Sequence, residues 1–258
     1  MNNRINELFA RKPQGILSVY FTAGFPSLDD TEEIILELEK NGVDLIEVGM
    51  PFSDPLADGP TIQQSSTVAL QNGMTISKLF EQLKDIRQKT QIPLVLMGYL
   101  NPVMQYGVER FCQKAAEVGI DGIILPDLPL REYVEEYKEL FEKYNLSKVF
   151  LITPQTPEAR IREIDSHTNG FIYMVSSAST TGKTAGLAEQ SQVYFERVAN
   201  MQLHNPGIIG FGIHNRDTFT QACNHASGAI IGSAFVKALQ QEGSLPQNIS
   251  TFIQSIKN

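Results

Sequence analysis

The amino-acid sequence predicts an α/β protein, a (β/α)8 TIM barrel formed by one domain over residues 1–258, with an extra helix at its N-terminus. Eight short apolar runs rich in β-branched residues alternate with longer amphipathic segments. These runs are apolar on both faces, which is typical of buried parallel strands covered by helices. A length of 258 residues suits one closed barrel of eight such units.

Each element can be placed from its pattern. The predicted strands cover residues 15–24, 43–51, 92–99, 122–127, 148–154, 170–177, 206–213 and 228–234. The predicted helices cover residues 27–42, 61–73, 75–90, 108–119, 130–144, 157–168 and 216–226, with further helices after the sixth and eighth strands. In the first of these, Ser27 is the expected N-cap with Asp30 three residues on, and Gly42 is the expected stop.

Composition excludes several classes of function. The chain has 21 basic and 29 acidic residues, a net charge of −8, and no run of Lys or Arg, so nucleic acid is not an expected partner. Cys112 and Cys223 are isolated and imply no disulfide framework. No segment has the pattern of a signal peptide or a membrane span, so we expect a cytoplasmic protein.

The stretch "EVGMPFSDPLADGP", residues 47–60, brings acidic residues to the end of the second strand. Side chains alternate along a strand, so Glu47 shares a face with Leu45 and Gly49 and is expected to point into the barrel. Burial there would raise the pKa of Glu47 toward neutrality, which suits an acid–base catalyst. A structural glutamate that pairs with a Lys or Arg, or caps a backbone amide, is the alternative.

The loop after this strand contains Pro51, Pro55 and Pro60, each of which fixes φ and removes a backbone donor. A stiff loop would hold Asp58 over the barrel mouth as a second carboxylate. Asp54 is an Asx-turn residue by default and otherwise a surface contact.

Glycine-bearing turns follow the sixth, seventh and eighth strands, in "STTGKTAG", "GFGIHN" and "IIGSAF". Barrels often bind phosphate at the loops after the last two strands, so Gly212, Gly232 and Ser233 are phosphate-site candidates. Glycines needed only for tight turns are the alternative. "STTGKT" lacks the first glycine of a P-loop and "GFGIHN" lacks the third glycine of the dinucleotide fingerprint, so neither ATP nor NAD is implied.

Two further kinds of site have weak signals. His167, His204, His214 and His225 show no paired spacing of metal ligands, so no metal is expected. Lys183 could form a Schiff base, as in phosphosugar aldolases, but its glycine-flanked loop is a poor place to desolvate an amine.

Seven motifs in order resemble the tryptophan synthase alpha chain family: "FTAGFP", "EVGMPFSDPLADGPTIQ", "MGYLNPVMQYG", "GIILPDLP", "FIYMVSSASTTG", "GFGI" and "IIGSAFV". The resemblance covers nearly the whole chain. It implies a lyase that cleaves indole-3-glycerol phosphate to indole and glyceraldehyde 3-phosphate in L-tryptophan biosynthesis. It also implies an alpha2beta2 assembly with a beta chain, which receives the indole and carries pyridoxal phosphate; no cofactor is implied for this chain.

The resemblance also implies roles for individual residues. Glu47 would be the proton-shuttling acid–base, and Asp58 would hold the indole N–H. The implied substrate-binding residues are Tyr20, Met97, Tyr99, Tyr173 and Phe211 around the indole ring and Gly182, Gly212, Gly232 and Ser233 at the phosphate. The implied contacts with the beta chain are Asp54, Asn101 and Asp127.

One position departs from the family pattern. Family members often carry an arginine where this chain has Ser177. We therefore expect the lid at residues 177–187 to close less tightly or in a different way, and its coupling to the partner to be weaker or different. Two other hypotheses stay open at this stage: a Schiff-base aldolase that uses Lys183, and a barrel retained chiefly to activate a beta chain.

Overall fold

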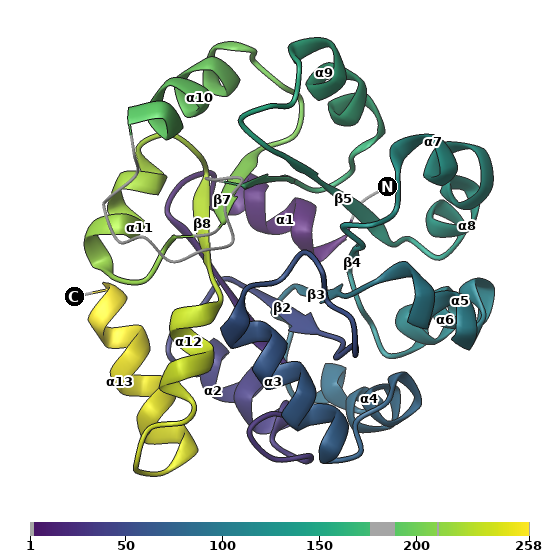
Figure 1. Ribbon diagram of the computed structural model, residues 1–258, viewed down its shortest axis with the longest axis vertical. Helices are drawn as coiled ribbons and strands as arrows, with labels where there is room; N and C mark the ends of the chain where they lie inside the picture. The colour runs from purple at the N-terminus through teal and green to yellow at the C-terminus, as the bar shows by residue number, and fades with distance from the viewer. Residues whose placement is uncertain (1–2, 176–188, 211, 258) are drawn as a thin grey trace.

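Eight parallel strands close into a barrel in the computed structural model, which describes residues 3–175, 189–210 and 212–257 (Figure 1). Each strand pairs with its neighbours in sequence, and β8 closes the barrel by pairing with β1. The predicted fold class is therefore confirmed. The strands are β1 (Ile16–Thr22), β2 (Leu45–Gly49), β3 (Leu94–Met97), β4 (Gly122–Ile124), β5 (Ser147–Ile152), β6 (Ile172–Val175), β7 (Gly207–Gly210) and β8 (Gly228–Ile231).

Most of the helices surround the barrel and cover the outer faces of the strands, whereas α1 lies behind the barrel in the view of Figure 1. The described helices are α1 (Arg4–Arg11), α2 (Thr31–Lys40), α3 (Pro60–Gln71), α4 (Ile76–Leu83), η1 (Ile86–Gln88), α5 (Leu100–Tyr106), α6 (Val108–Glu117), α7 (Leu130–Glu132), η2 (Tyr133–Tyr137), α8 (Lys138–Lys143), α9 (Glu158–His167), α10 (Glu189–Asn200), α11 (Arg216–Cys223), α12 (Ser233–Ala238) and α13 (Leu245–Lys257). Among the described helices, none is long and apolar enough to cross a membrane.

The start predicted for the helix after the first strand, with Ser27 as its N-cap, is wrong. Helix α2 begins at Thr31, and Asp30 is its N-cap residue. The Asp30 carboxylate accepts a hydrogen bond from the backbone N–H of Ser27 at 2.9 Å, so residues 27–30 form a turn before the helix. The end agrees better with expectation, because the helix stops at Lys40 and Gly42 has φ +81°.

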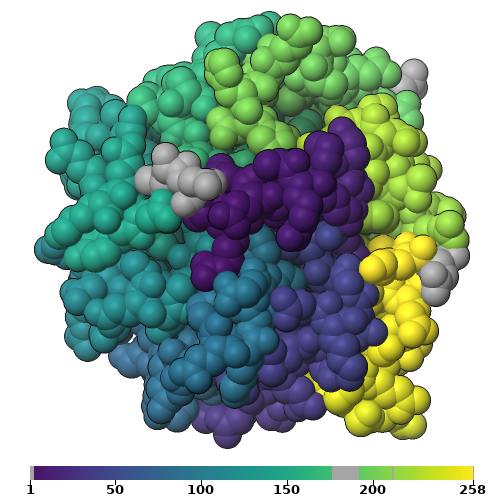
Figure 2. Space-filling view, turned by 180° about the vertical axis from the view of Figure 1, so that it is seen from behind, coloured from purple at the N-terminus to yellow at the C-terminus, as the bar shows by residue number. Residues whose placement is uncertain are grey.

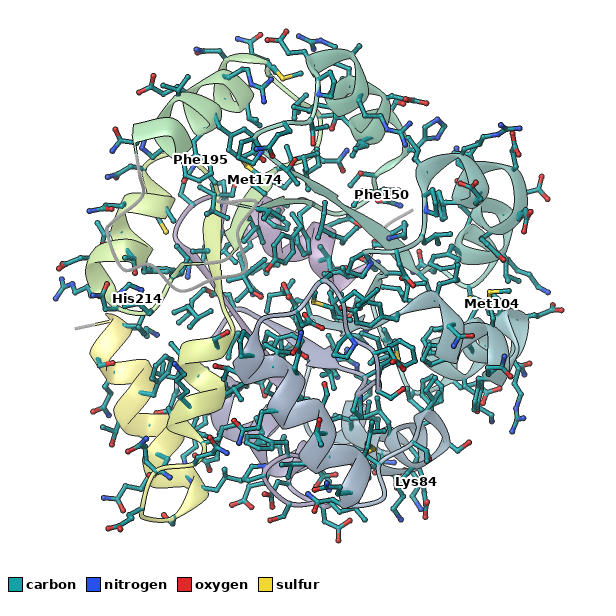
Figure 3. All side chains as sticks on the ribbon, viewed as in Figure 1. Lys84, Met104, Phe150, Met174, Phe195 and His214 are labelled. Carbon is teal, nitrogen blue, oxygen red and sulfur yellow. The ribbon has the colours of Figure 1, made fainter. Side chains whose placement is uncertain are left out.

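Apolar side chains fill the layer between the strands and the helices (Figure 3). Phe150 on β5, Met174 on β6 and Phe195 on α10 are buried there, whereas Met104 on α5 is 53% exposed. Cys112 is also buried, and both cysteines are free thiols. This tightly filled layer leaves the loops at the strand ends to form sites.

Helix α1 lies across the N-terminal end of the barrel (Figure 2). Ile5 and Leu8 on this helix are buried, and a Cβ added to Gly122 of β4 would lie 2.9 Å from Ile5 Cδ1. The helix therefore closes the end of the barrel opposite the strand C-termini.

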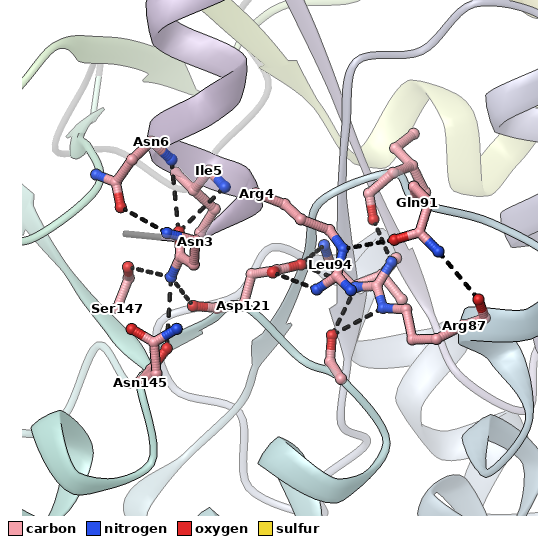
Figure 4. A network of polar contacts seen from close by, with 12 residues as sticks. Asn3, Arg4, Ile5, Asn6, Arg87, Gln91, Leu94, Asp121, Asn145 and Ser147 are labelled. Atoms are coloured by element: carbon pink, nitrogen blue, oxygen red, sulfur yellow. Dashed lines mark hydrogen bonds and ion pairs between the residues drawn. The ribbon is translucent and has the colours of Figure 1, made fainter. Parts of the chain in front are cut away.

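Asn3 fixes the start of α1 (Figure 4). Its side-chain oxygen accepts hydrogen bonds from the N–H groups of Ile5 and Asn6, which satisfies the first turn of the helix. Its amide nitrogen donates to the carbonyl of Asp121 and to Ser147 Oγ, both at 2.8 Å. One side chain thus caps a helix and ties it to strands β4 and β5.

The Asp121 carboxylate is the centre of this polar network (Figure 4). It is 2% exposed and accepts hydrogen bonds from Arg4 at 3.0 Å and Arg87 at 2.8 Å. It also accepts one from the backbone N–H of Leu94, at 2.9 Å. Asp121 therefore links α1, η1 and the start of β3 at the closed end of the barrel.

We expect Asp121→Asn to lower the free energy of unfolding by about 3 kcal/mol, because it leaves two partly buried arginines without a charge partner. Urea denaturation followed by circular dichroism checks this. Glu117→Gln is the matched control, since its pair with Lys114 is 44% exposed on both sides and contributes little. Equal changes in the two variants would contradict the role of Asp121.

Candidate functional site

Glu47 lies at the middle of β2, with its side chain in the barrel interior. It pairs in register with Tyr20 of β1 and is fully buried. It also interacts electrostatically with Tyr173, which belongs to β6 on another part of the barrel wall. The carboxyl group therefore faces the space enclosed by the strands.

The surroundings of Glu47 disfavour its charged form. Oε1 accepts a hydrogen bond from Ser18 Oγ at 3.3 Å, and Oε2 has no hydrogen-bond partner within the described chain. No Lys, Arg or His of the described residues forms an ion pair with Glu47, so the alternative of a structural salt bridge finds no support there. Burial raises the pKa of Glu47 to about 8, and the Ser18 hydrogen bond opposes the rise.

Asp58 lies in the loop between β2 and α3, where Tyr99 holds it. The Tyr99 hydroxyl donates to Asp58 Oδ2 at 2.9 Å and accepts a hydrogen bond from the Ala57 N–H at 3.0 Å. Burial raises the pKa of Asp58 to about 6, and the Tyr99 hydrogen bond opposes the rise. At neutral pH the buried Glu47 is therefore protonated, while Asp58 is mostly ionised.

Two tyrosines approach the strands so closely that only glycine fits beneath them. A Cβ added to Gly49 would lie 2.2 Å from the Tyr20 hydroxyl, and one added to Gly210 would lie 2.2 Å from the Tyr173 hydroxyl. Burial raises the pKa of each tyrosine above its ordinary value, so both side chains stay neutral. The two tyrosines therefore place uncharged aromatic side chains in the barrel interior beside Glu47.

A cavity of about 10 Å³ lies beside Asp58. Its lining is mostly apolar and aromatic and comprises Tyr20, Met50, Phe52, Asp58, Ser66, Met97, Gly98, Tyr99 and Pro126. The rings of Phe52 and Tyr99 lie 5.3 Å apart between centroids. A space of this size holds about one water molecule, so an aromatic ligand requires some of these side chains to move.

The glycines proposed for phosphate lie at the C-terminal ends of neighbouring strands. Gly212 follows β7, and Gly232 follows β8 directly before Ser233, the first residue of α12. Gly212 is exposed with φ +75°, and Ser233 is also exposed. Their amides lie at the face of the barrel where Asp58 lies. Gly182, Phe211, Ser177 and Lys183 are outside the described residues.

The three residues expected to meet a partner are exposed near the same rim. Asp54 lies in the β2–α3 loop, Asn101 on α5, and Asp127 after β4. The Asp127 carboxylate accepts hydrogen bonds from the backbone N–H of Leu100 at 2.9 and 3.0 Å. Leu56, between Asp54 and Asp58 in the same loop, is 90% exposed.

Sequence reasoning missed the contacts that hold the two carboxylates. No motif marks Ser18 as a site residue, although it lies two residues before Tyr20 and alternation places the two side chains on one face of β1. Tyr99 was expected only in an indole pocket. Its bond to Asp58 joins residues 41 positions apart, and no local pattern indicates it. Among the described residues, no group of three His, Cys, Asp or Glu side chains could hold a metal ion.

Comparison with known proteins gives consistent results. The family description that matches residues 8–257 is "Tryptophan synthase alpha chain". The chain is 60% identical over 255 residues to the protein of that name from Christiangramia forsetii, covering 99% of this chain and 98% of the relative. It is also 60% identical to the one from Flavobacterium johnsoniae, covering 99% and 100%.

Solved structures agree with these relatives. A tryptophan synthase alpha chain from Legionella pneumophila superposes with a TM-score of 0.88 at 30% identity, covering 100% of this chain and 97% of that one. A chain of a tryptophan synthase complex from Pyrococcus furiosus superposes with a TM-score of 0.85 at 33% identity, covering 95% and 98%.

The raised pKa of Glu47 has a consequence for stability. Between about pH 4.5 and about pH 8 the folded chain keeps a proton that the unfolded chain releases, so stability falls as pH rises through this window. Glu47→Gln cannot ionise. We expect it to be more stable than the parent above about pH 8, with the advantage vanishing below the pKa of an unfolded glutamate.

Urea denaturation midpoints measured across this pH range check the prediction. Glu117→Gln is the control, because this exposed side chain loses the same charge without being buried. A midpoint difference between Glu47→Gln and the parent that stays constant with pH would argue against a buried, protonated Glu47.

Proposed function

Because this chain belongs to the tryptophan synthase alpha chain family, we propose that Glu47 and Asp58 are its catalytic residues. The chain is a carbon–carbon lyase that cleaves indole-3-glycerol phosphate to indole and glyceraldehyde 3-phosphate in tryptophan biosynthesis, as the alpha subunit that works with a beta subunit. One observation supports the assignment most: the buried Glu47 carboxyl has an oxygen, Oε2, with no hydrogen-bond partner among the described residues, and Tyr20 and Tyr173 each interact with both Glu47 and Asp58.

The two carboxyl groups are suited to different tasks by their surroundings. Glu47, with a pKa of about 8, is protonated at neutral pH and can donate to C3 of the indole ring. Asp58, with a pKa of about 6, is mostly ionised and can accept the ring N–H and stabilise the positive charge that protonation creates. A pair of carboxyl groups with separated pKa values is the expected arrangement of an acid and an electrostatic stabiliser.

Cleavage then follows as a retro-aldol step. The bond between C3 of the ring and the adjacent glycerol carbon breaks, and its electron pair returns to the ring to restore indole. Glu47, now ionised, or a water removes the proton of the hydroxyl on that carbon, which becomes the aldehyde of glyceraldehyde 3-phosphate. Positioned acid–base catalysis contributes roughly 10²–10⁴ in rate, so orientation and electrostatic stabilisation contribute the remainder.

The remaining site residues position the substrate. In this proposal the ring lies among Tyr20, Met97, Tyr99, Tyr173 and Phe211, and the phosphate lies at the amides of Gly182, Gly212, Gly232 and Ser233. The aromatic lining of the cavity beside Asp58 supports the first assignment. The positions of Gly212 and Gly232 at the ends of β7 and β8 support the second.

The proposed chemistry uses no cofactor in this chain, since one acid–base and one carboxylate account for every proton moved. Pyridoxal phosphate belongs to the beta chain in this proposal, within an alpha2beta2 assembly. Asp54, Asn101 and Asp127 would contact the beta chain, and their exposure on the rim near Asp58 supports this. We also propose that the enzyme is cytoplasmic and that the whole chain forms one domain.

Glu47→Gln is expected to fold and bind substrate but to lose roughly 10²-fold or more in cleavage rate, because the amide cannot donate or retake the proton. Indole release in the presence of the beta chain measures the rate. Cleavage that persists in this variant, together with covalent trapping of substrate by borohydride, would favour the Schiff-base mechanism of Lys183 instead.

Tyr99→Phe is expected to raise the pKa of Asp58, because a hydroxyl that stabilises the carboxylate is lost. Asp58 acts in its ionised form, so activity falls as pH drops through its pKa. The acidic limb of the kcat/KM profile should therefore move to higher pH by about half to one unit. Tyr106→Phe is the control, because Tyr106 packs against Phe80 and Phe111 away from Asp58. An unmoved acidic limb in Tyr99→Phe would rule out this role of the hydroxyl.

A further inference from the structure

We propose that Ser18 is a positioning residue for the reaction: its hydroxyl holds one oxygen of the Glu47 carboxyl, so that the other oxygen exchanges the proton with the substrate. The inference rests on the proposed catalytic role of Glu47. It assigns a function to a buried polar side chain on β1.

The contact is enclosed on all sides. Ser18 and Glu47 are both 0% exposed, and Ser18 Oγ lies 3.3 Å from Glu47 Oε1. Ser18 pairs in register with Leu45 of β2 and Ile230 of β8, so rigid strands fix it on both sides. A buried hydroxyl needs a hydrogen-bond partner, and the described residues offer Ser18 the Glu47 carboxyl as that partner.

This contact makes the two carboxyl oxygens unequal. Oε1 accepts the Ser18 hydrogen bond, whereas Oε2 is buried without a partner in the described chain. An acid proton on Oε1 would compete with the hydroxyl for the same oxygen, so the proton belongs on Oε2. The serine therefore selects the reactive oxygen and limits rotation of the carboxyl group.

The other groups around Glu47 cannot do this. The titratable groups that face it are Tyr20 from β1 and Tyr173 from β6, and both remain neutral phenols. Asp58, from the loop after β2, interacts with the same tyrosines and is also a carboxyl group. Within the described residues, Ser18 is thus the group that favours the ionised form of Glu47.

The reaction needs this balance because Glu47 must both give and retake a proton. Without the hydroxyl the ionised form would be more costly, and the protonated form would persist to higher pH. Activity that depends on protonated Glu47 falls as pH rises through its pKa. Loss of the serine hydroxyl should therefore move the basic limb of the pH profile and leave the acidic limb, which reports Asp58, in place.

The test compares three variants, each mixed with the beta chain, by their kcat/KM profiles against pH. Ser18→Ala is expected to move the basic limb up by about half to one unit. Ser18→Thr keeps a hydroxyl and should return this limb to its original position. Ser147→Ala is the matched control, since it removes a buried hydroxyl at the other end of the barrel, where Asn3 is its partner. An unchanged basic limb in Ser18→Ala, or an equal shift in Ser147→Ala, would overturn the proposal.

A second measurement separates this inference from the proposed function. Titration of ¹³C-labelled glutamate carboxyl groups by NMR gives the pKa of Glu47 without turnover, and Glu47→Gln identifies its signal. Ser18→Ala should raise that pKa by the same amount. If Glu47→Gln kept full activity, the catalytic assignment would fail, yet this titration would still report whether Ser18 holds the carboxyl. No change in the titration would refute the contact.

Discussion

The burial of one carboxyl group, Glu47, inside the barrel is the constraint on which the rest of the site depends. Placing an ionisable group among apolar strands costs free energy unless it is paired or protonated. Here no described cation pairs with it, so the group keeps its proton to an unusually high pH. Burial of Glu47 thus explains both its proposed role as an acid and the loss of stability expected as pH rises. The closed barrel holds a protonated acid in position because every strand around it is fixed by two neighbours.

Asp58 obeys a different constraint, because it lies on a loop rather than on a strand. Prolines stiffen the loop, but a hydroxyl from the β3–α5 connection sets the position of the carboxylate. Leu100, the residue after Tyr99, donates its backbone N–H to Asp127 on the rim. Asp127, proposed for partner contact, is therefore linked to Asp58 through two hydrogen bonds and the peptide unit between Tyr99 and Leu100. The residues proposed for partner contact and those proposed for catalysis therefore lie on loops that are hydrogen-bonded to one another.

The two ends of the barrel divide stability and chemistry. At the N-terminal end, Asn3 caps α1 and donates a hydrogen bond to the Asp121 carbonyl. The Asp121 carboxylate accepts hydrogen bonds from two arginines and from a backbone N–H of β3. Inside the barrel, Glu47 Oε2 has no hydrogen-bond partner among the described residues, and at the C-terminal end the cavity beside Asp58 has room for about one water. Buried polar groups that are fully satisfied stabilise a fold, whereas an unsatisfied one marks a place where a ligand can supply the missing partner.

Much of this protein could be predicted from the sequence by itself, because the relevant signals are local. Strand and helix periodicity predicted the barrel, and alternation along "LIEVG" indicated that Glu47 points inward. The quoted motifs identified the family. A local pattern failed at the helix after the first strand: Ser27 could cap it, but residues 27–30 form a turn, and Asp30 takes the N-cap position without a side-chain hydrogen bond to the helix. Only the tertiary structure decided the contacts between strands and loops. Ser18 meets Glu47, and Tyr99 meets Asp58, because closure of the barrel brings them together, and no spacing in the sequence records that distance.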